Sequence, residues 1–163
     1  MHNKSQTIPL SSLLRLRPHA VASVSGSEKY PNIYGTVRFY HTKLGVIVVA
    51  EINGLPNPRG QCESPVFGFH IHSGNRCRGN ADDPFADAMM HYNPRGCLHP
   101  YHAGDLPPLF GADGYALSVF LTNRFTVEDI IGKTVIIHAK PDDFTSQPAG
   151  NSGEKIACGV IRG

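Results

Sequence analysis

Histidine is the residue type in this sequence whose number and spacing point to chemistry. The chain of 163 residues contains 9 histidines, and histidine is the commonest metal ligand among protein side chains. His70 and His72 are two positions apart in a segment with the composition of a β-strand. Because alternate residues of a strand point to the same face, both imidazoles can reach one metal ion. Taken alone, this pair is more typical of two surface histidines than of a metal site.

A second group of candidate ligands lies in the polar segment that follows. His91, His99, His102 and Asp105 occur close together there. Three histidines and a carboxylate are a donor set that suits tetrahedral zinc. The short step from His102 to Asp105, through an Ala-Gly pair, lets a tight turn bring both side chains to one ion. A solvated polar loop contains the same residue types, so that interpretation stays open at this point.

His138 is the third candidate, at the end of an apolar run. It follows Val135, Ile136 and Ile137. A single histidine in such a place is more often a packed or strand-edge residue than a ligand. On its own, His138 therefore predicts no site.

Short β-strands are the elements that must position these side chains. Runs rich in β-branched residues recur between Gly, Pro, Asn and Asp turn signals. They predict strands at 20–25, 33–40, 45–52, 66–72, 115–121, 134–138 and 156–161. No long stretch has helical periodicity, although 126–131 has the composition of one short helical turn. This pattern predicts an all-β sandwich or barrel.

The segment 73–114 does not fit the strand pattern. It is long, polar and rich in Gly, Pro, Asp and His, and a loop of such length in a small domain is normally functional or disordered. The ligand-type residues that it contains favour a function. We find no internal repeat and no second domain.

Composition excludes several classes of function. A net charge of +2 without a block of like charges does not indicate nucleic-acid binding. No stretch approaches the roughly 18 uninterrupted apolar residues of a membrane span. The N-terminus is a poor signal peptide, so the chain as it stands is expected in the cytoplasm; it would be secreted or periplasmic if a leader had been removed. None of the four cysteines forms a CxxC pair, which argues against a thiolate zinc ribbon.

Taken together, the motifs resemble the Cu,Zn superoxide dismutase family. The segment GFHIH (68–72) resembles the copper-ligand strand of that family, HYNP (91–94) the motif of its bridging histidine, and HAGDL (102–106) its zinc loop. The segments IIHAKPDD (136–143) and GNSGEKIACGVI (150–161) resemble its VHxxxDD segment and its C-terminal signature. The resemblance runs from about Ala20 to Ile161, almost the whole chain.

The resemblance implies a set of metal ligands. Copper is expected on His70, His72, His91 and His138, and zinc on His91, His99, His102 and Asp105, so that His91 bridges both metals and acts in catalysis. Asp142 matches the carboxylate that links His70 to His99, and such partners orient metal-binding imidazoles. Cys77 and Cys158 are expected to form the family's disulfide. Cys62 and Cys97 have no counterpart, which leaves a second disulfide or free thiols.

The resemblance also implies an activity. We expect a superoxide dismutase that converts superoxide into oxygen and hydrogen peroxide by redox cycling of copper, with zinc supporting the bridging His91. Copper is required because zinc has no redox chemistry. The alternative is a non-catalytic copper- and zinc-binding protein of the same fold. The complete histidine set favours the enzyme, whereas Lys155 and the short uncharged segment 144–149 favour the alternative.

Lys155 stands where the family has an arginine that attracts the anionic substrate. Lysine keeps the charge but lacks the planar, two-pronged donor geometry of arginine. We therefore expect Lys155 to serve in catalysis at a reduced rate.

The resemblance finally implies an architecture and partners. We expect a Greek-key β-sandwich, or flattened barrel, of about eight antiparallel strands in residues 19–163, after an N-terminal extension at 1–18. Long loops at 73–114 and 139–154 would hold the metals on its outer face. Superoxide is the expected small-molecule partner, no nucleic acid or membrane is expected, and the family implies a homodimer.

Overall fold

The computed structural model describes residues 9–13, 15–58, 60 and 65–163. Nine strands occur in these residues: β1 (Ala20–Gly26), β2 (Tyr34–Thr42), β3 (Gly45–Asn53), β4 (Val66–Phe67), β5 (Phe69–His72), β6 (Leu109–Phe110), β7 (Ala116–Thr122), β8 (Thr134–His138) and β9 (Lys155–Arg162). The helical elements are α1 (Leu10–Leu13), α2 (Val127–Ile130) and the 3-10 turn η1 (Ala86–Ala88). The prediction of an all-β chain is confirmed.

Alternation of apolar residues explains why the central strands form one sheet. In the antiparallel pair β2–β3, Val37 lies opposite Ala50 and Phe39 lies opposite Val48. All four side chains are buried. Because residues two apart share a face, this register places the apolar side of both strands toward the interior. A one-residue slip would expose both apolar sets.

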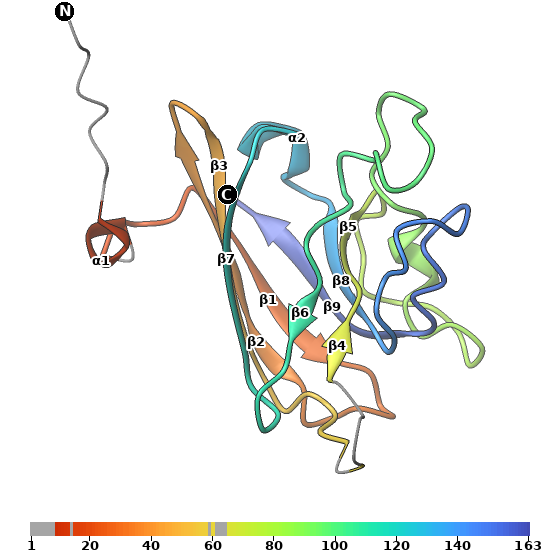
Figure 1. Cartoon of the computed structure of the whole chain (residues 1–163). Helices are drawn as coiled ribbons and strands as arrows, with labels where there is room; N and C mark the ends of the chain where they lie inside the picture. Colours follow the sequence, from red (N-terminus) through yellow and green to blue (C-terminus); the bar gives the residue numbers. More distant parts are fainter. Residues whose placement is uncertain (1–8, 14, 59, 61–64) are drawn as a thin grey trace, which may run out of the picture.

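The strands form a curled antiparallel sheet that amounts to most of a barrel (Figure 1). Its seven strands follow the order β5-β8-β9-β1-β2-β3-β7. The neighbours β3 and β7, and likewise β5 and β8, are far apart in sequence, as a Greek-key connection requires. A second ladder pairs β4 with β6, and β6 lies against β7. This short ladder covers the opening between the two edges of the large sheet.

The predicted strand 66–72 is divided at Gly68, which separates β4 from β5. The Gly68 N–H donates to the Lys140 carbonyl at 2.8 Å, and the Gly68 carbonyl accepts from the His138 N–H at 2.8 Å. Gly68 therefore binds the segment after β8 and interrupts the regular ladder. The strand β6 was not predicted, because two residues are too few to show any periodicity.

One apolar cluster fills the interior of the barrel. Phe39, Phe69, Leu109, Ile137 and Ile161 are among its fully buried members. The helical turn predicted at 126–131 is α2, which covers one end of this cluster with buried residues. Its start is fixed by a capping box, in which the Thr126 hydroxyl accepts from the Asp129 N–H and the Asp129 carboxylate accepts from the Thr126 N–H.

The N-terminal boundary at residue 19 stays a prediction. The His19 N–H donates to the Phe39 carbonyl at 2.9 Å, and Figure 1 shows α1 beside the sheet and not within it. Residues 1–8 and 14 of the proposed extension lie outside the described part. Within the described residues, none of the helices has the length and apolar character needed to cross a bilayer.

Candidate metal centre

Strand β5 is the base on which the predicted ligands are assembled. It carries His70 and His72, and one of its edges pairs with β8. Its other edge meets the long loop through two isolated bridges, His70 with Asp105 and His72 with His91. Figure 1 shows the loops that follow β5 and β8 gathered on this side of the barrel. Ligand-type residues distant in sequence are thereby brought to one strand.

Backbone hydrogen bonds hold the loop against β5. The Ile71 N–H donates to the Gly104 carbonyl at 2.9 Å, and the Tyr92 N–H donates to the Ile71 carbonyl at 2.8 Å. A Cβ atom at Gly104 would collide with the Ile71 carbonyl oxygen. Only glycine permits so close an approach, which explains the glycine at position 104 between His102 and Asp105.

The first group consists of the four predicted copper ligands, which we call the four-histidine group. One ring nitrogen from each lies within 4.8 Å of the others, and all four residues are buried: His70, His72, His91 and His138. The Nε2 atoms of His72 and His138 are 3.3 Å apart. His70 Nδ1 and His91 Nε2 are buried without a hydrogen-bond partner. Unpaired buried nitrogens are costly, and a metal ion would satisfy them.

Oxygen acceptors fix the outward nitrogens of three of these rings. His72 Nδ1 is 2.7 Å from the Met89 carbonyl, and His138 Nδ1 is 3.1 Å from the Gly153 carbonyl. His70 Nε2 is 2.7 Å from the Asp142 carboxylate. A neutral imidazole has one N–H and one lone pair, so these acceptors require the lone pair on the inward nitrogen. This is the tautomer that binds a metal.

Burial keeps the imidazoles of His70, His72 and His138 neutral. Loss of hydration lowers the pKa of His70 to about 4 and that of His138 to about 3, against an ordinary value of 6.5. The pKa of His72 also lies well below 6.5, through burial and the neighbouring His138. Neutral imidazole is the form that coordinates metals, so the rings need not lose a proton at neutral pH.

The second group consists of the four predicted zinc ligands, all buried and likewise within 4.8 Å of one another: His91, His99, His102 and Asp105. His91 Nδ1 lies 2.8 Å from the Asp105 carboxylate. The Nδ1 atoms of His99 and His102 lie 3.1 and 3.3 Å from the same carboxylate, yet neither has a hydrogen-bond partner. Inward nitrogens around one carboxylate fit a tetrahedral zinc ion. His91 belongs to both groups, with Nε2 in one and Nδ1 in the other.

Asp142 joins the two groups. Its Oδ2 lies 2.7 Å from His70 Nε2, and its Oδ1 lies 2.9 Å from His99 Nε2. Burial would raise its pKa, but the hydrogen bonds from His70, Phe144 and His99 outweigh burial and lower the pKa to about 2. A Cβ atom at Gly150, whose φ is +68°, would collide with this carboxylate. The ionised Asp142 thus orients one ring of each group.

Sequence analysis missed two residues that hold the second group. Arg124 Nη1 donates to the carbonyls of Pro100, His102 and Asp105 at 3.1 to 3.2 Å. Gln147 accepts from the His99 N–H at 3.0 Å and donates to the His99 carbonyl at 2.7 Å. Both act on backbone groups far away in sequence, so no local pattern could have indicated them.

Lys155 lies at the mouth of the four-histidine group. A pocket of about 340 Å³, which we call the mouth pocket, is lined by His72, His91, His138 and Lys155, among others. The Lys155 ammonium lies 2.6 Å from the Asp83 carboxylate and donates to the Phe85 carbonyl at 3.1 Å. Lys155 therefore lines the same pocket as three of the four histidines, and it is paired with a carboxylate that the sequence did not indicate.

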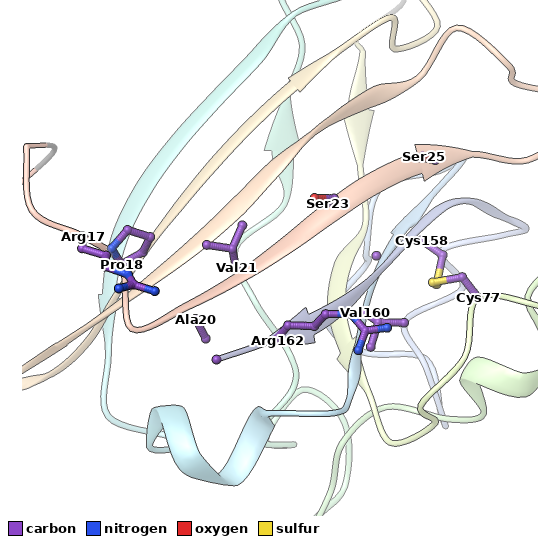
Figure 2. Close-up of a pocket in the computed structure, with 12 residues that line it drawn as sticks. Arg17, Pro18, Ala20, Val21, Ser23, Ser25, Cys77, Cys158, Val160 and Arg162 are labelled. Carbon is purple, nitrogen blue, oxygen red and sulfur yellow. A yellow bond between two sulfur atoms is a disulfide. The ribbon is translucent and has the colours of Figure 1, made fainter.

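The predicted disulfide between Cys77 and Cys158 is present and joins positions 81 residues apart. It ties the loop after β5 to β9. Figure 2 shows it at one end of a hollow of about 630 Å³ along β1 and β9, with Arg17 at the other end. No histidine, aspartate or glutamate lines this hollow, and both groups of candidate ligands lie elsewhere. Cys97 has a free thiol, and Cys62 lies outside the described residues.

Comparisons with known proteins agree with this geometry. The family model for copper/zinc superoxide dismutase (SODC) matches residues 33–161. Superoxide dismutase (Cu-Zn) 2 of Aquifex aeolicus is 34% identical over 145 residues, which cover 80% of each chain. The Cu-Zn superoxide dismutase of Deinococcus radiodurans is 32% identical, covering 80% of this chain and 78% of its own. That of Legionella pneumophila is 31% identical, covering 98% of this chain and 99% of its own.

Proposed function

The chain belongs to the copper/zinc superoxide dismutase family, and from this premise we propose that it converts superoxide into oxygen and hydrogen peroxide at the four-histidine group. One observation carries the proposal. Four buried rings each turn one nitrogen inward, while oxygen acceptors hold the opposite nitrogens of His70, His72, His91 and His138. A purely structural zinc site needs no second group of this kind.

The free nitrogens support a distinct assignment for each metal. Copper would be held by His70 Nδ1 and by the Nε2 atoms of His72, His91 and His138. Zinc would be held by the Nδ1 atoms of His91, His99 and His102 and by the Asp105 carboxylate. Imidazole is a good ligand for both metals, and the mixed nitrogen and oxygen set is typical of zinc.

Each catalytic cycle consumes two superoxide ions and two protons and yields one oxygen and one hydrogen peroxide. Copper bound by these rings would supply the electron transfer, because copper has two accessible oxidation states, whereas zinc has no redox chemistry. The protein supplies position and protons. His91 Nδ1 is fixed at Asp105, so its Nε2 faces the four-histidine group. When that atom is not holding copper, it is placed to take a proton from water and to pass it to the product. Lys155 is the cation beside the approaching anion.

Superoxide consumption tests the proposal directly. Protein loaded with one copper and one zinc per chain should remove superoxide much faster than zinc-only protein, after correction for free copper. A His138→Gln variant, which removes a ligand from the four-histidine group alone, should lose the copper-dependent activity but still bind zinc. Activity in the two-metal protein no higher than that of free copper would contradict the proposed enzyme.

A non-catalytic copper- and zinc-binding protein is the second candidate. Two observations favour it: the Lys155 charge is paired with Asp83, and the segment 144–149 has no charged residue to attract an anion. Such a protein would bind both metals stably and show no turnover, which the same experiment distinguishes from the enzyme.

A homodimer belongs to the same proposal. Leu117, Val119 and Leu121 on β7 are exposed by 59%, 39% and 49%, and alternate residues on a strand form one stripe. An exposed apolar stripe on an outer strand supports association of two copies. Light scattering should give the mass of two chains, and Val119→Asp should give the mass of one. A wild-type monomer at all concentrations would contradict the dimer.

A further inference from the structure

The charges that line the mouth pocket are mostly negative. Asp82, Asp83, Glu154 and Lys155 are its charged lining residues, apart from the histidines. All residues that line this pocket belong to the described part of the chain, and Lys155 is the one lysine or arginine among them. A site that attracts a small anion is expected to show the opposite balance.

Further hydrogen bonds hold both partners of the ion pair between Lys155 and Asp83 in place. Asp83 Oδ1 accepts from the Phe85 N–H at 3.0 Å, and the Asp83 N–H donates to Asn80 at 3.0 Å. Its other oxygen receives the ammonium at 2.6 Å, and the lysine side chain is only 15% exposed. The ion pair is thus part of an ordered turn, unlike an exposed pair between two mobile side chains.

The remaining charges of the pocket do not restore a positive field. Glu154 accepts from Lys29 and from the Tyr30 hydroxyl, both at 2.7 Å, so it has its own cation outside the pocket. Asp82 forms no ion pair with any residue that the structure describes. With Glu154 balanced by Lys29 and Asp83 balanced by Lys155, one negative charge remains.

We propose that Asp83 sets the anion affinity of the copper pocket, because it holds the Lys155 ammonium at the mouth and cancels its charge. Opposite charges at hydrogen-bond distance cancel a large part of each other's field at distances beyond their own separation. The mouth residues therefore add little attraction for an anion beyond that of the metal ions themselves. The inference rests on the proposed copper site, and it assigns to Asp83 a positioning role through Lys155, without contact to the reacting atoms.

Azide binding to the Cu(II)-loaded, zinc-loaded protein tests this proposal without turnover. In Asp83→Asn, the one amide oxygen and the Phe85 carbonyl can still accept from Lys155, while the Phe85 N–H loses its side-chain acceptor and the carboxylate charge is gone. Azide should then bind about threefold to tenfold more tightly, as expected for a local field change. Lys155→Gln leaves Asp83 unpaired and should weaken azide binding, and the double variant should lose the gain. The shift of the Cu(II) absorption band measures affinity in each case.

Asp82→Asn is the matched control, since it removes an equal charge from the same pocket without touching the ion pair. A gain equal to that of Asp83→Asn would overturn the proposal, because total charge alone would then decide affinity. Unchanged azide affinity in both Asp83→Asn and Lys155→Gln would overturn it as well. Failure of the copper site is a separate result, since the spectrum before azide addition would lack nitrogen-ligated Cu(II).

Discussion

Asp142 is the single side chain on which both metal groups depend. Its two oxygens accept from His70 and His99, one ring of each group. In Asp142→Asn only one oxygen remains as an acceptor, so one ring loses its orientation. We expect the affinity for the metal held by that ring to fall by about 10- to 100-fold.

Competition with a chromophoric chelator would measure copper and zinc affinity of this variant separately. Asp113→Asn is a suitable control, because Asp113 is exposed and distant from the ligands in the hydrogen-bond network. Wild-type affinity for both metals in Asp142→Asn would show that the carboxylate orients neither ring.

The buried histidines should make the metal-free protein sensitive to acid. The pKa values of His70 and His138 are about 4 and about 3 in the folded chain, below the ordinary 6.5. Between these values the unfolded chain binds more protons, so the free energy of unfolding falls as pH falls. We expect the urea midpoint of metal-free protein to decrease from pH 7 to pH 4.

His138→Gln should reduce the slope of this decrease, since one of the contributing rings is removed. A urea midpoint that does not change between pH 7 and pH 5 would contradict the neutral, buried state of these rings. At residue scale, the two groups of candidate ligands were predictable, because histidine and aspartate in these motifs are distinctive. The partner of Lys155 was not, since an aspartate such as Asp83 is common in polar loops.

The disulfide is the element-scale link between the long loop and β9. It closes a separation of 81 residues, and such cross-links mainly restrict the unfolded chain. Replacing Cys77 and Cys158 together by Ser should cost about 2–5 kcal/mol of unfolding free energy. Denaturant unfolding measures this loss, and Cys97→Ser, which removes a free thiol, should change the free energy by less than about 0.5 kcal/mol. Equal stability of both variants would contradict this prediction.

Arg124 is the element-scale support of the zinc loop. Its guanidinium donates to three carbonyls of that loop, so Arg124→Gln should release the backbone around His102 and Asp105. We expect zinc affinity to fall about tenfold or more, with copper affinity affected less. Chelator competition measures both. Arg95→Gln, at an exposed position of the same loop, should leave both unchanged, and an equal loss there would contradict a specific role for Arg124.

Strands and loops differed in how far the sequence predicted them. The strand predicted at 134–138 coincides with β8. Four consecutive β-branched residues precede His138, and such a run strongly favours a strand. The loop 73–114 contains η1 and β6, which have too few residues for a periodic signal. The contacts of Arg124 and Gln147 depend on how distant segments pack, and no spacing along the chain encodes them.

At the scale of the whole molecule, the apolar core and the two groups of candidate metal ligands lie in different places. The apolar cluster lies inside the barrel, whereas the two groups of ligands are held by β5, the end of β8 and the long loops. The metal-free chain should therefore keep its strands, as seen by far-ultraviolet circular dichroism. Zinc at about a thousandfold excess over its dissociation constant should add about 4 kcal/mol to the unfolding free energy.

Thermal and denaturant unfolding with and without zinc would measure this gain. The expected result is an unchanged β spectrum with a higher midpoint. A metal-free chain without β structure would contradict the separation, because folding would then depend on the ligands and not on the barrel.

The segment between Cys77 and His91 suggests an order of biogenesis. It begins at the disulfide, contains the Asp83 that holds Lys155, and provides the Met89 carbonyl that orients His72. A newly synthesised chain whose thiols are still reduced would lack this anchor, so we expect oxidation to precede copper acquisition. His99, His102 and Asp105 lie outside the segment, and zinc acquisition should depend on oxidation much less. Disulfide formation would then be a required step before copper binding, but not before zinc binding. Copper and zinc uptake, measured for reduced and for oxidised chains, would test this order.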